Sequence, residues 1–286
     1  MEKAWAEIAV DFENTLDSVY PKEEVQQLFL MVYEHIRAKK SIHYSVEKHL
    51  SLSPEEYLRI NDILAELSLS KPIQHILGEA YFYGKTFEVS PHTLIPRPET
   101  EELVHLIIHD HKGKEDLKVI DIGTGTACIP ISLALHLDGQ FTAIEISKDA
   151  MEVARRNNAK YDTKINFIQA DILEWEVFFP EELRFDIIVS NPPYITPKEM
   201  NEMHNNVLLH EPHTALFVEE EAPLLFYDYI ADFALVHLET SGTLYFEINQ
   251  YLGKETADLL IKEGFKDVQI IKDMYGADRI IKAKRP

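Results

Sequence analysis

Residues 191–194, Asn-Pro-Pro-Tyr, follow the apolar run FDIIVS and carry the most suggestive chemistry in the sequence. Prolines fix the backbone and lack N–H groups, so the neighbouring carbonyl groups remain free to accept hydrogen bonds. The side-chain oxygen of Asn191 and the carbonyl oxygen of Pro192 can together accept both hydrogens of a planar –NH2 group, and Tyr194 can stack on the planar system that carries it. Such a nitrogen is a weak nucleophile, so the quartet indicates catalysis by positioning and electrostatics. Taken alone, it is also compatible with a proline-rich loop and a packed tyrosine.

A glycine-rich turn lies in VIDIGTGTACI at 119–129, between a predicted strand and a predicted helix. Gly123 and Gly125 permit a tight turn and a close approach of a ligand to the main chain. Glu145 ends the next predicted strand about 20 residues further on, where a carboxylate can bind both hydroxyls of a ribose. The third glycine of the dinucleotide pattern is missing, so an adenosine-type cofactor without phosphates fits this loop better than a dinucleotide.

Two further carboxylates fit the same cofactor site. Asp121 lies in the first predicted strand and can help to order the glycine-rich turn. Asp171 follows the third strand, where it can accept a hydrogen bond from an adenine amino group, with Ile172 against the ring. Each carboxylate alone is more typical of a loop or a helix cap. Because open α/β sheets bind ligands at the carboxyl ends of their strands, their joint position indicates a cofactor site.

The elements that must position these residues begin near residue 116, where predicted strands and helices start to alternate. This pattern is typical of a mostly parallel sheet with helices on both faces. The last two strand-like runs, 267–272 and 278–284, are too close in sequence for a parallel crossover and can pair only as antiparallel neighbours. The Asn-Pro-Pro-Tyr quartet follows the fourth strand, which we expect beside the first strand where the strand order reverses. The quartet should therefore lie over the cofactor.

The first 75 residues contain no glycine and show helical periodicity. Ser53 and Glu56 have the spacing of a capping box at the start of one helix. Another predicted helix places one apolar stripe on a single face, formed by Val25, Leu28, Phe29, Val32 and Tyr33. We expect a small helical bundle, which serves for packing or for docking a partner.

The segment that follows is rich in aromatic and β-branched residues and contains a Gly-Lys turn, which predicts a β-hairpin. The sequence therefore predicts three parts: an N-terminal helical bundle at 1–75, a β-hairpin linker at 76–95 and a catalytic domain at 96–286.

Composition restricts the class of partner. The 286 residues are 45% hydrophobic, and 28 basic against 49 acidic residues give a net charge of −21. Nucleic-acid binding depends on basic side chains, so this balance argues against a polyanionic partner. The single cysteine, Cys128, allows no internal disulfide and no cysteine zinc site. The start does not resemble a signal peptide and no apolar run reaches about 18 residues, so we expect a cytoplasmic protein that does not associate with a membrane. We also expect no metal site.

Together with LIPRPETEELV at 94–104, the motifs VIDIGTGTACI, FTAIEIS and NPPYI resemble the HemK/PrmC family. EPHTALF at 211–217 and FEINQYLGKE at 246–255 are also similar to family landmarks, and the likeness covers residues 74–286. Enzymes of this family use S-adenosylmethionine to methylate the side-chain amide of the glutamine in the GGQ motif of peptide chain release factors. The resemblance implies an α/β class I S-adenosylmethionine-dependent methyltransferase with a seven-stranded Rossmann-like sheet, a small N-terminal all-α bundle and a β-hairpin linker. S-adenosylhomocysteine would be the product.

The resemblance also implies roles for individual residues. The cofactor would be bound by Asp121, Gly123, Thr124, Gly125, Thr126, Ala127, Glu145, Asp171, Ile172 and Asn191. The substrate amide would be presented by Asn191, Pro192, Pro193 and Tyr194. Arg97 and Thr100 would line the mouth of the site or the cofactor pocket, although Arg97 could equally form an ion pair that bridges the domains.

The chain departs from the family pattern at three places. Ala127 stands where glycine is frequent, which could tighten the space beside the cofactor. Glu145 stands where aspartate is frequent, and it keeps the charge with a longer side chain. Asn249 replaces the commoner glycine of EIG, and asparagine tolerates a positive φ, so the fold need not change.

Two other functions remain open at the level of the sequence. The quartet also occurs in enzymes that methylate the exocyclic amine of adenine or guanine in nucleic acids, because an –NH2 group on a planar ring presents the same problem. A non-catalytic cofactor-binding or docking module is the third interpretation. The acidic net charge and the PRPETE segment after a hairpin favour a protein substrate, and we expect a monomeric enzyme that does not bind nucleic acid directly.

Overall fold

The computed structural model describes residues 3–202 and 205–286. The chain forms two compact units. Within the described ranges, the first unit contains residues 3–78 and 205–210, and the second contains residues 79–202 and 211–286. The predicted β-hairpin therefore belongs to the same unit as the predicted catalytic domain.

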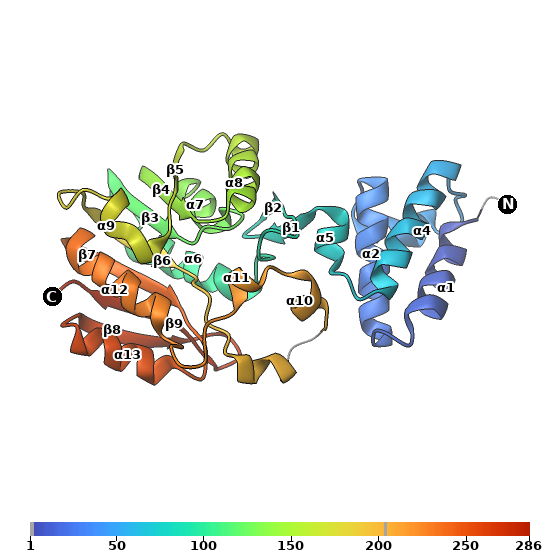
Figure 1. The fold of residues 1–286 in the computed structure, drawn as a ribbon. Coiled ribbons are helices and arrows are strands. Elements are labelled where there is room, and N and C mark those ends of the chain that lie inside the picture. The colour runs from blue at the N-terminus through green and yellow to red at the C-terminus, as the bar shows by residue number, and fades with distance from the viewer. Residues whose placement is uncertain (1–2, 203–204) are drawn as a thin grey trace. The chain divides into compact units, whose positions relative to one another are not determined.

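The first unit is an α-helical bundle (Figure 1). Its helices are α1 (Trp5–Leu16), α2 (Lys22–Arg37), η1 (Ser41–His43), α3 (Tyr44–Glu47), α4 (Pro54–Ser68), α5 (Ile73–Leu77) and α10 (Asn205–His210). The predicted apolar stripe of α2 is buried along its whole length, against residues of α1 and α4. The predicted capping box is confirmed, because the backbone N–H of Glu56 donates to Ser53 Oγ at 3.1 Å and the Ser53 N–H donates to Glu56 Oε2 at 2.8 Å.

The second unit begins with the predicted β-hairpin, formed by β1 (Glu79–Phe82) and β2 (Lys85–Glu88). Tyr83 and Gly84 connect the strands with φ angles of 46° and 76°. A two-residue turn with positive φ at both positions matches the twist of the strands it joins. The hairpin is tied to the rest of this unit through Asn157, whose side chain accepts from the Glu88 N–H at 2.7 Å and donates to the Glu88 carbonyl at 3.0 Å.

The predicted seven-stranded sheet forms the centre of the second unit, in the order β5-β4-β3-β6-β7-β9-β8. Its strands are β3 (Leu117–Ile122), β4 (Gly139–Glu145), β5 (Ile165–Gln169), β6 (Phe185–Ser190), β7 (Leu238–Glu247), β8 (Lys266–Lys272) and β9 (Asp278–Lys284). The strands from β5 to β7 are parallel, whereas β9 runs antiparallel to both of its neighbours, as the short final connection predicts. The strand order reverses between β3 and β6, so a ligand site is expected at the carboxyl ends of these two strands.

Helices cover both faces of this sheet (Figure 1). The helical segments are α6 (Pro98–His111), α7 (Cys128–Ala134), α8 (Lys148–Tyr161), η2 (Ile172–Glu174), α9 (Trp175–Phe178), η3 (Pro197–Glu202), α11 (His213–Leu216), α12 (Leu225–His237) and α13 (Gly253–Lys262). Residues of α6, α7 and α8 pack on one face, and residues of α12 and α13 pack on the other. Among the helices of the described ranges, none combines the length and apolarity needed to cross a membrane.

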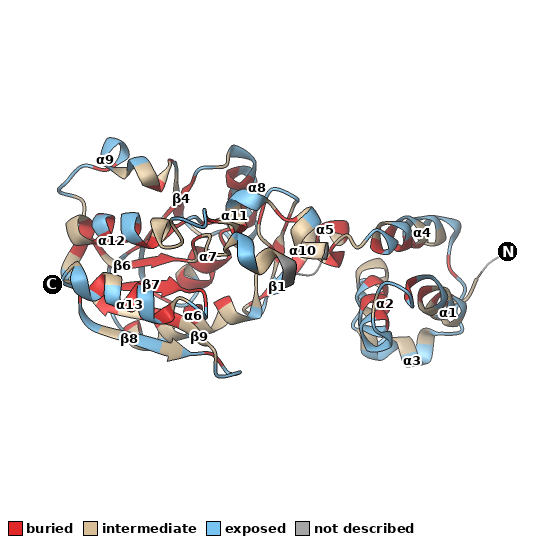
Figure 2. Cartoon of the chain, turned by 60° about the horizontal axis from the view of Figure 1, so that its bottom comes forward, coloured by how far each residue is buried: buried red, intermediate tan, exposed pale blue. Residues whose placement is uncertain are grey.

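Side chains alternate between the two faces along each central strand. In β3, Ile120 and Ile122 face α12, whereas Val119 faces α6 and α7. In β7, Phe246 shares the first face and Tyr245 the second. Figure 2 shows that the buried residues are concentrated in the central strands, while the outer sides of the helices are exposed. The same alternation directs the two acidic residues near these strand ends, Asp121 and Glu247, toward the α6 face.

Candidate active site

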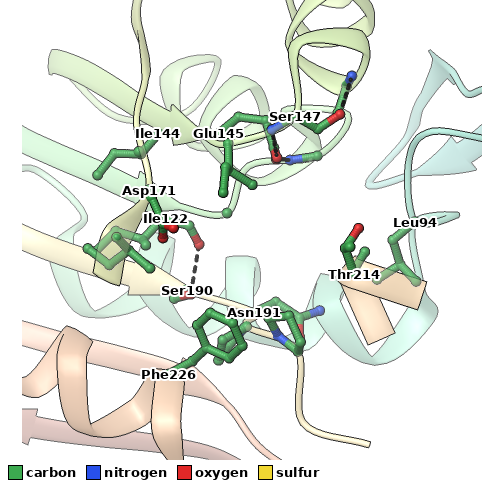
Figure 3. A pocket seen from close by; sticks show the side chains of 18 of the residues that line it. Leu94, Ile122, Ile144, Glu145, Ser147, Asp171, Ser190, Asn191, Thr214 and Phe226 are labelled. Carbon is green, nitrogen blue, oxygen red and sulfur yellow. Dashed lines mark hydrogen bonds between the residues drawn. The ribbon is translucent and has the colours of Figure 1, made fainter. Parts of the chain in front are cut away.

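A cavity of about 600 Å³ opens at the carboxyl ends of β3, β4 and β6. The following predicted site residues line it: Gly123, Gly125, Glu145, Asp171, Ile172, Asn191, Pro192 and Pro193. Figure 3 shows Glu145 on one side of this cavity and Asn191 on the opposite side, with Asp171 between them at the edge. The structure therefore brings the glycine-rich turn, the two strand-end carboxylates and the start of the Asn-Pro-Pro-Tyr quartet into one pocket.

The glycine-rich turn is held by the neighbouring strand. The N–H groups of Gly123 and Thr124 both donate to the Ile144 carbonyl at the end of β4, at 3.0 and 2.9 Å. Gly123 and Gly125 have φ angles of 77° and 54°, which a residue with a side chain adopts only with strain. Ala127 has this conformation too, with φ of 61°. The replacement of glycine at this position therefore strains the backbone where α7 begins.

Asp121 lies directly beneath this turn and is completely buried. Within the described residues, neither of its carboxylate oxygens has a partner in good hydrogen-bond geometry, although the buried hydroxyl of Thr124 is close enough to interact with the carboxyl group. Burial raises the pKa of Asp121 from 3.8 to about 7, with the Thr124 side chain opposing the rise and the charge of Glu145 adding to it. A buried polar group without a partner costs free energy unless a ligand supplies one.

The Glu145 carboxylate is fixed by two backbone groups. The Gly125 N–H donates to Oε2 at 2.8 Å, and the Ser147 N–H donates to Oε1 at 2.9 Å. Burial raises the pKa of Glu145, and these backbone donors oppose that rise. Each carboxylate oxygen can accept a second hydrogen bond, so both remain able to bind hydroxyl groups of a ligand in the cavity.

Asp171 and Ile172 form the next part of the wall. Asp171 caps the short helix η2, where its Oδ1 accepts from the Leu173 N–H at 2.9 Å. The other Asp171 oxygen does not take part in this cap. Ile172 contributes an apolar surface to the same cavity. This combination suits a planar heterocycle with an amino group at its edge.

The opposite wall contains residues that the motifs did not indicate. Phe226 and Ile230 reach the cavity from α12, and Thr214 and Phe217 reach it from the segment around α11. Figure 3 shows Phe226 close to Asn191 and Thr214 near Leu94. Phe226 and Ile230 come from a stretch without a recognised motif, so only the packing of α12 on the sheet reveals them. Thr214 and Phe217 lie in the EPHTALF segment, for which the sequence predicted no site residue.

Tyr194 and Thr100 are not among the residues that line the cavity; they converge behind it on a buried glutamate. Thr100, at the start of α6, donates its hydroxyl to Glu247 Oε2 at 2.7 Å, and Tyr194 donates to Glu247 Oε1 at 3.2 Å. Asn191 Nδ2 in turn donates to Thr100 Oγ1 at 3.3 Å. Glu247 was not predicted as a site residue, although a single acid that ends the apolar strand run LYFE is a signal that could have indicated it.

Arg97 forms an ion pair inside the second unit. Its guanidinium lies 2.5 Å from Glu211 Oε1, and the second Glu211 oxygen accepts from the Ile95 N–H at 3.1 Å. The Glu211 side chain is fully buried, whereas a third of the Arg97 side chain is exposed. This pair joins the segment before α6 to the segment around α11, and both segments contribute to the cavity wall.

The remaining predicted residues, Thr126 and Ala127, are buried next to the glycine-rich turn and support it from behind. The donor set as a whole fits S-adenosylmethionine. The Glu145 oxygens suit a ribose, and Asp171 with Ile172 suits an adenine. Asp121 and Thr124 are buried and are not among the residues that line the cavity, so the Asp121 carboxyl can act on a cationic group there only through its charge. A cavity of about 600 Å³ is also within the usual size range of small-molecule sites.

Comparison with known proteins agrees with this assignment. A family model described as a methyltransferase domain matches residues 113–232. The release factor glutamine methyltransferase of Flavobacterium psychrophilum is 45% identical over 275 residues, which are 95% of each chain. The release factor glutamine methyltransferase of Bacteroides thetaiotaomicron is 39% identical over 279 residues, which are 97% of this chain and 99% of that protein.

Among solved structures, a 16S rRNA methyltransferase of T. thermophilus in complex with AdoMet and guanosine superimposes with a TM-score of 0.54 at 19% identity. The match covers 73% of this chain and 50% of that one, and it confirms the class I methyltransferase fold. The identity and the coverage of the two bacterial relatives go further than the fold. This chain belongs to the family of release factor glutamine methyltransferases.

Proposed function

We propose that this protein transfers a methyl group from S-adenosylmethionine to the side-chain amide nitrogen of the glutamine in the GGQ motif of peptide chain release factors. The observation that carries the proposal is that a single cavity contains the adenosine-type binding residues and the paired acceptors of Asn191 and Pro192. Membership in the release factor glutamine methyltransferase family supports the same substrate.

The cofactor is held by the residues of the cavity's strand-end side. Asp121 provides the negative charge beneath the glycine-rich turn, Glu145 binds the ribose, and Asp171 and Ile172 border the adenine. The buried Thr124 hydroxyl lies close to Asp121. When bound, S-adenosylmethionine supplies an electrophilic methyl group to the reaction.

The chain's own contribution to the reaction is to orient a weak nucleophile. The side-chain oxygen of Asn191 and the carbonyl oxygen of Pro192 accept the two N–H groups of the substrate glutamine, which fixes its amide plane. Pro192 and Pro193 keep this backbone in one conformation and leave no competing N–H donor. Phe226 and Ile230 line the same cavity with apolar side chains, which lowers the polarity around these hydrogen bonds. Tyr194 anchors the end of the quartet through its hydroxyl.

Transfer of label from S-adenosylmethionine tests the proposal. Purified release factors would be offered next to forms in which the GGQ glutamine is replaced, and next to deproteinised RNA and DNA. We expect label on the intact release factor alone. Label on nucleic acid would favour methylation of an exocyclic base amine, and label on a release factor without its GGQ glutamine would move the reaction to another residue.

The role of Asn191 has a separate test. Asn191→Ala should lose most methyl transfer, while its affinity for S-adenosylmethionine stays within several-fold of the wild-type value. A variant that transfers nearly as fast as the wild type would contradict the proposed acceptor role.

The proposal also includes a cytoplasmic location, a monomeric state and no direct binding to nucleic acid, as the composition suggests. The acidic net charge of −21 supports the last point. Size-exclusion chromatography with light scattering tests the monomeric state, and a mass of twice 33.1 kDa would contradict it.

A further inference from the structure

A chain of hydrogen bonds extends from Asn191 into the protein. Asn191 Nδ2 donates to Thr100 Oγ1 at 3.3 Å, and the Thr100 hydroxyl donates to Glu247 Oε2 at 2.7 Å. Thr100 is 3% exposed and Glu247 is 1% exposed, so water cannot substitute for a missing partner. The three residues come from the loop after β6, the first turn of α6 and the end of β7.

The sheet register explains why these three meet. Ser190 at the end of β6 is paired with Phe246 of β7, so Asn191 and Glu247 follow at neighbouring strand ends. Glu247 points to the same sheet face as Tyr245, and α6 packs on that face. The first turn of α6 therefore brings the Thr100 hydroxyl between Asn191 and Glu247.

The direction of this chain is set by its last member. An ionised carboxylate only accepts hydrogen bonds, and a hydroxyl has a single proton to donate. When the Thr100 hydroxyl donates its hydrogen bond to Glu247, its oxygen can only accept a hydrogen bond from Asn191. Asn191 must therefore direct its Nδ2 group toward Thr100. The Asn191 oxygen is then left as the side-chain atom that can accept from a substrate.

The reverse orientation of the Asn191 amide is disfavoured by the same reasoning. Its oxygen would need the Thr100 proton, and a buried oxygen of Glu247 would lose its donor. Tyr194 occupies the other carboxylate oxygen at 3.2 Å, so it cannot replace Thr100 at Oε2. Burial raises the pKa of Glu247, and the charge of Glu99 adds to that rise. The Thr100 hydroxyl, the charge of Arg279 and the Tyr194 hydroxyl oppose it and favour the ionised form.

We propose that Glu247 and Thr100 are positioning residues that fix the orientation of the Asn191 side-chain amide, so that its oxygen faces the amine to be methylated. The inference rests on the proposed function for its substrate, a glutamine amide. According to this proposal, the buried acceptor Glu247, 56 residues after Asn191 in the sequence, determines which end of the Asn191 amide faces the substrate.

The kinetic test uses variants of nearly constant shape. Thr100→Val removes the hydroxyl, Thr100→Ser retains it, and Glu247→Gln removes the charge that makes the last residue a pure acceptor. Thr256→Val is the matched control, because Thr256 in α13 is also fully buried, and its hydroxyl donates to the carbonyl of Leu252, the residue just before this helix. Thr256 does not line the cavity.

We expect Thr100→Val and Glu247→Gln each to lower kcat for release factor methylation about ten- to a hundredfold, the loss that follows from one charge-assisted hydrogen bond. The KM for the release factor and the affinity for S-adenosylmethionine should change little. Thr100→Ser should recover most of kcat. The double variant should be no slower than the slower single variant, because both changes act through the same amide. Equal losses in Thr256→Val, or multiplied losses in the double variant, would overturn the proposal.

A second measurement is independent of catalysis. In ¹⁵N-labelled protein, the side-chain NH2 signals of Asn191 can be assigned by their loss in Asn191→Asp. One of these protons should be shifted downfield and protected from solvent exchange in the wild type, and both effects should vanish in Thr100→Val and weaken in Glu247→Gln. Their persistence in Thr100→Val would overturn the proposal. A wild-type protein that transfers no methyl group to a release factor would contradict the proposed function alone, since the amide signals would still report the orientation.

Discussion

The replacement of Asp121 by asparagine should stabilise the protein without cofactor and weaken its binding of the cofactor. Asp121 is fully buried, and neither carboxylate oxygen has a partner in good hydrogen-bond geometry among the described residues. The carboxylate is therefore unfavourable for the empty fold and useful only when a cationic group lies nearby. Asparagine has nearly the same shape and removes the charge.

The size of the effect follows from the pKa of Asp121, which burial raises from 3.8 to about 7. At pH values between 3.8 and about 7, Asp121 is protonated in the native protein but ionised in the unfolded chain. The native state then binds more protons, so the free energy of unfolding falls as the pH rises through this window. One pH unit corresponds to about 1.4 kcal/mol, so the full loss above pH 7 is at most about 4 kcal/mol.

Denaturant unfolding at pH 5 and pH 8 measures this effect. Each unit contains one tryptophan, Trp5 in the first and Trp175 in the second. A Trp5→Phe background therefore restricts the fluorescence signal to the unit that contains Asp121. We expect Asp121→Asn to raise the unfolding free energy at pH 8 by up to about 4 kcal/mol and to change it much less at pH 5.

The same variant should bind S-adenosylmethionine about ten- to a hundredfold more weakly at pH 7, which calorimetry can measure. Wild-type binding at pH 6 should also release a proton, and Asp121→Asn should not release it. If Asp121→Asn destabilises the unit equally at pH 5 and pH 8, then the carboxylate is already well solvated or partnered without cofactor. Both the stabilisation expected for Asp121→Asn and its pH dependence would then be contradicted.

Three further changes test other features of the site. Ala127→Gly should raise the unfolding free energy by about 0.5–1 kcal/mol because it removes a side chain from a residue with positive φ. As a control, Ala159→Gly on the exposed side of α8 should lower the unfolding free energy by about the same amount. Denaturant midpoints of the two variants measure both effects. Arg97→Ala should lower the unfolding free energy by about 1–2 kcal/mol because it leaves the buried Glu211 carboxylate without its cation. Most of that loss should disappear when Glu211→Gln is added, and additive losses in the double variant would contradict the ion-pair explanation. Burial raises the pKa of Cys128 to about 12, so iodoacetamide at pH 8 should alkylate the native thiol far more slowly than the unfolded one, as mass spectrometry would show.

The sequence predicted those parts of the fold and site that depend on local pattern. Alternating strand and helix patterns predicted the mixed seven-stranded sheet, and the short connection before β9 predicted its antiparallel pairing. The predicted site residues that line the cavity, such as Glu145 and Asp171, lie at or just after the ends of apolar strands. The end of a parallel strand at the point of reversal is recognisable from the order of elements alone.

The features that sequence reasoning missed depend on contacts between distant segments. Thr100 and Glu247 are 147 positions apart, and Glu211 accepts from an N–H group 116 positions away. Neither pairing can be read from spacing, because it requires α6 and the α11 segment to be placed on the sheet. The departure at Asn249 is similar, since its side chain donates to the Tyr194 carbonyl at 3.0 Å and to Glu199. The sequence suggested only a turn variant at this position, but in the structure the Asn249 side chain holds the loop that follows β6.

The two buried acids on the α6 face have opposite relations to stability. Glu247 accepts from two hydroxyl groups, so its charge is compensated within the protein and fixes an orientation. Asp121 has no partner in good hydrogen-bond geometry among the described residues, and burial raises its pKa to about 7. The strand that carries the Asn-Pro-Pro-Tyr quartet lies between the strands of these two acids. The acid behind Asn191 is therefore compensated by hydroxyl groups of the protein, whereas the acid near the glycine-rich turn is relieved by protonation or by a nearby cationic ligand.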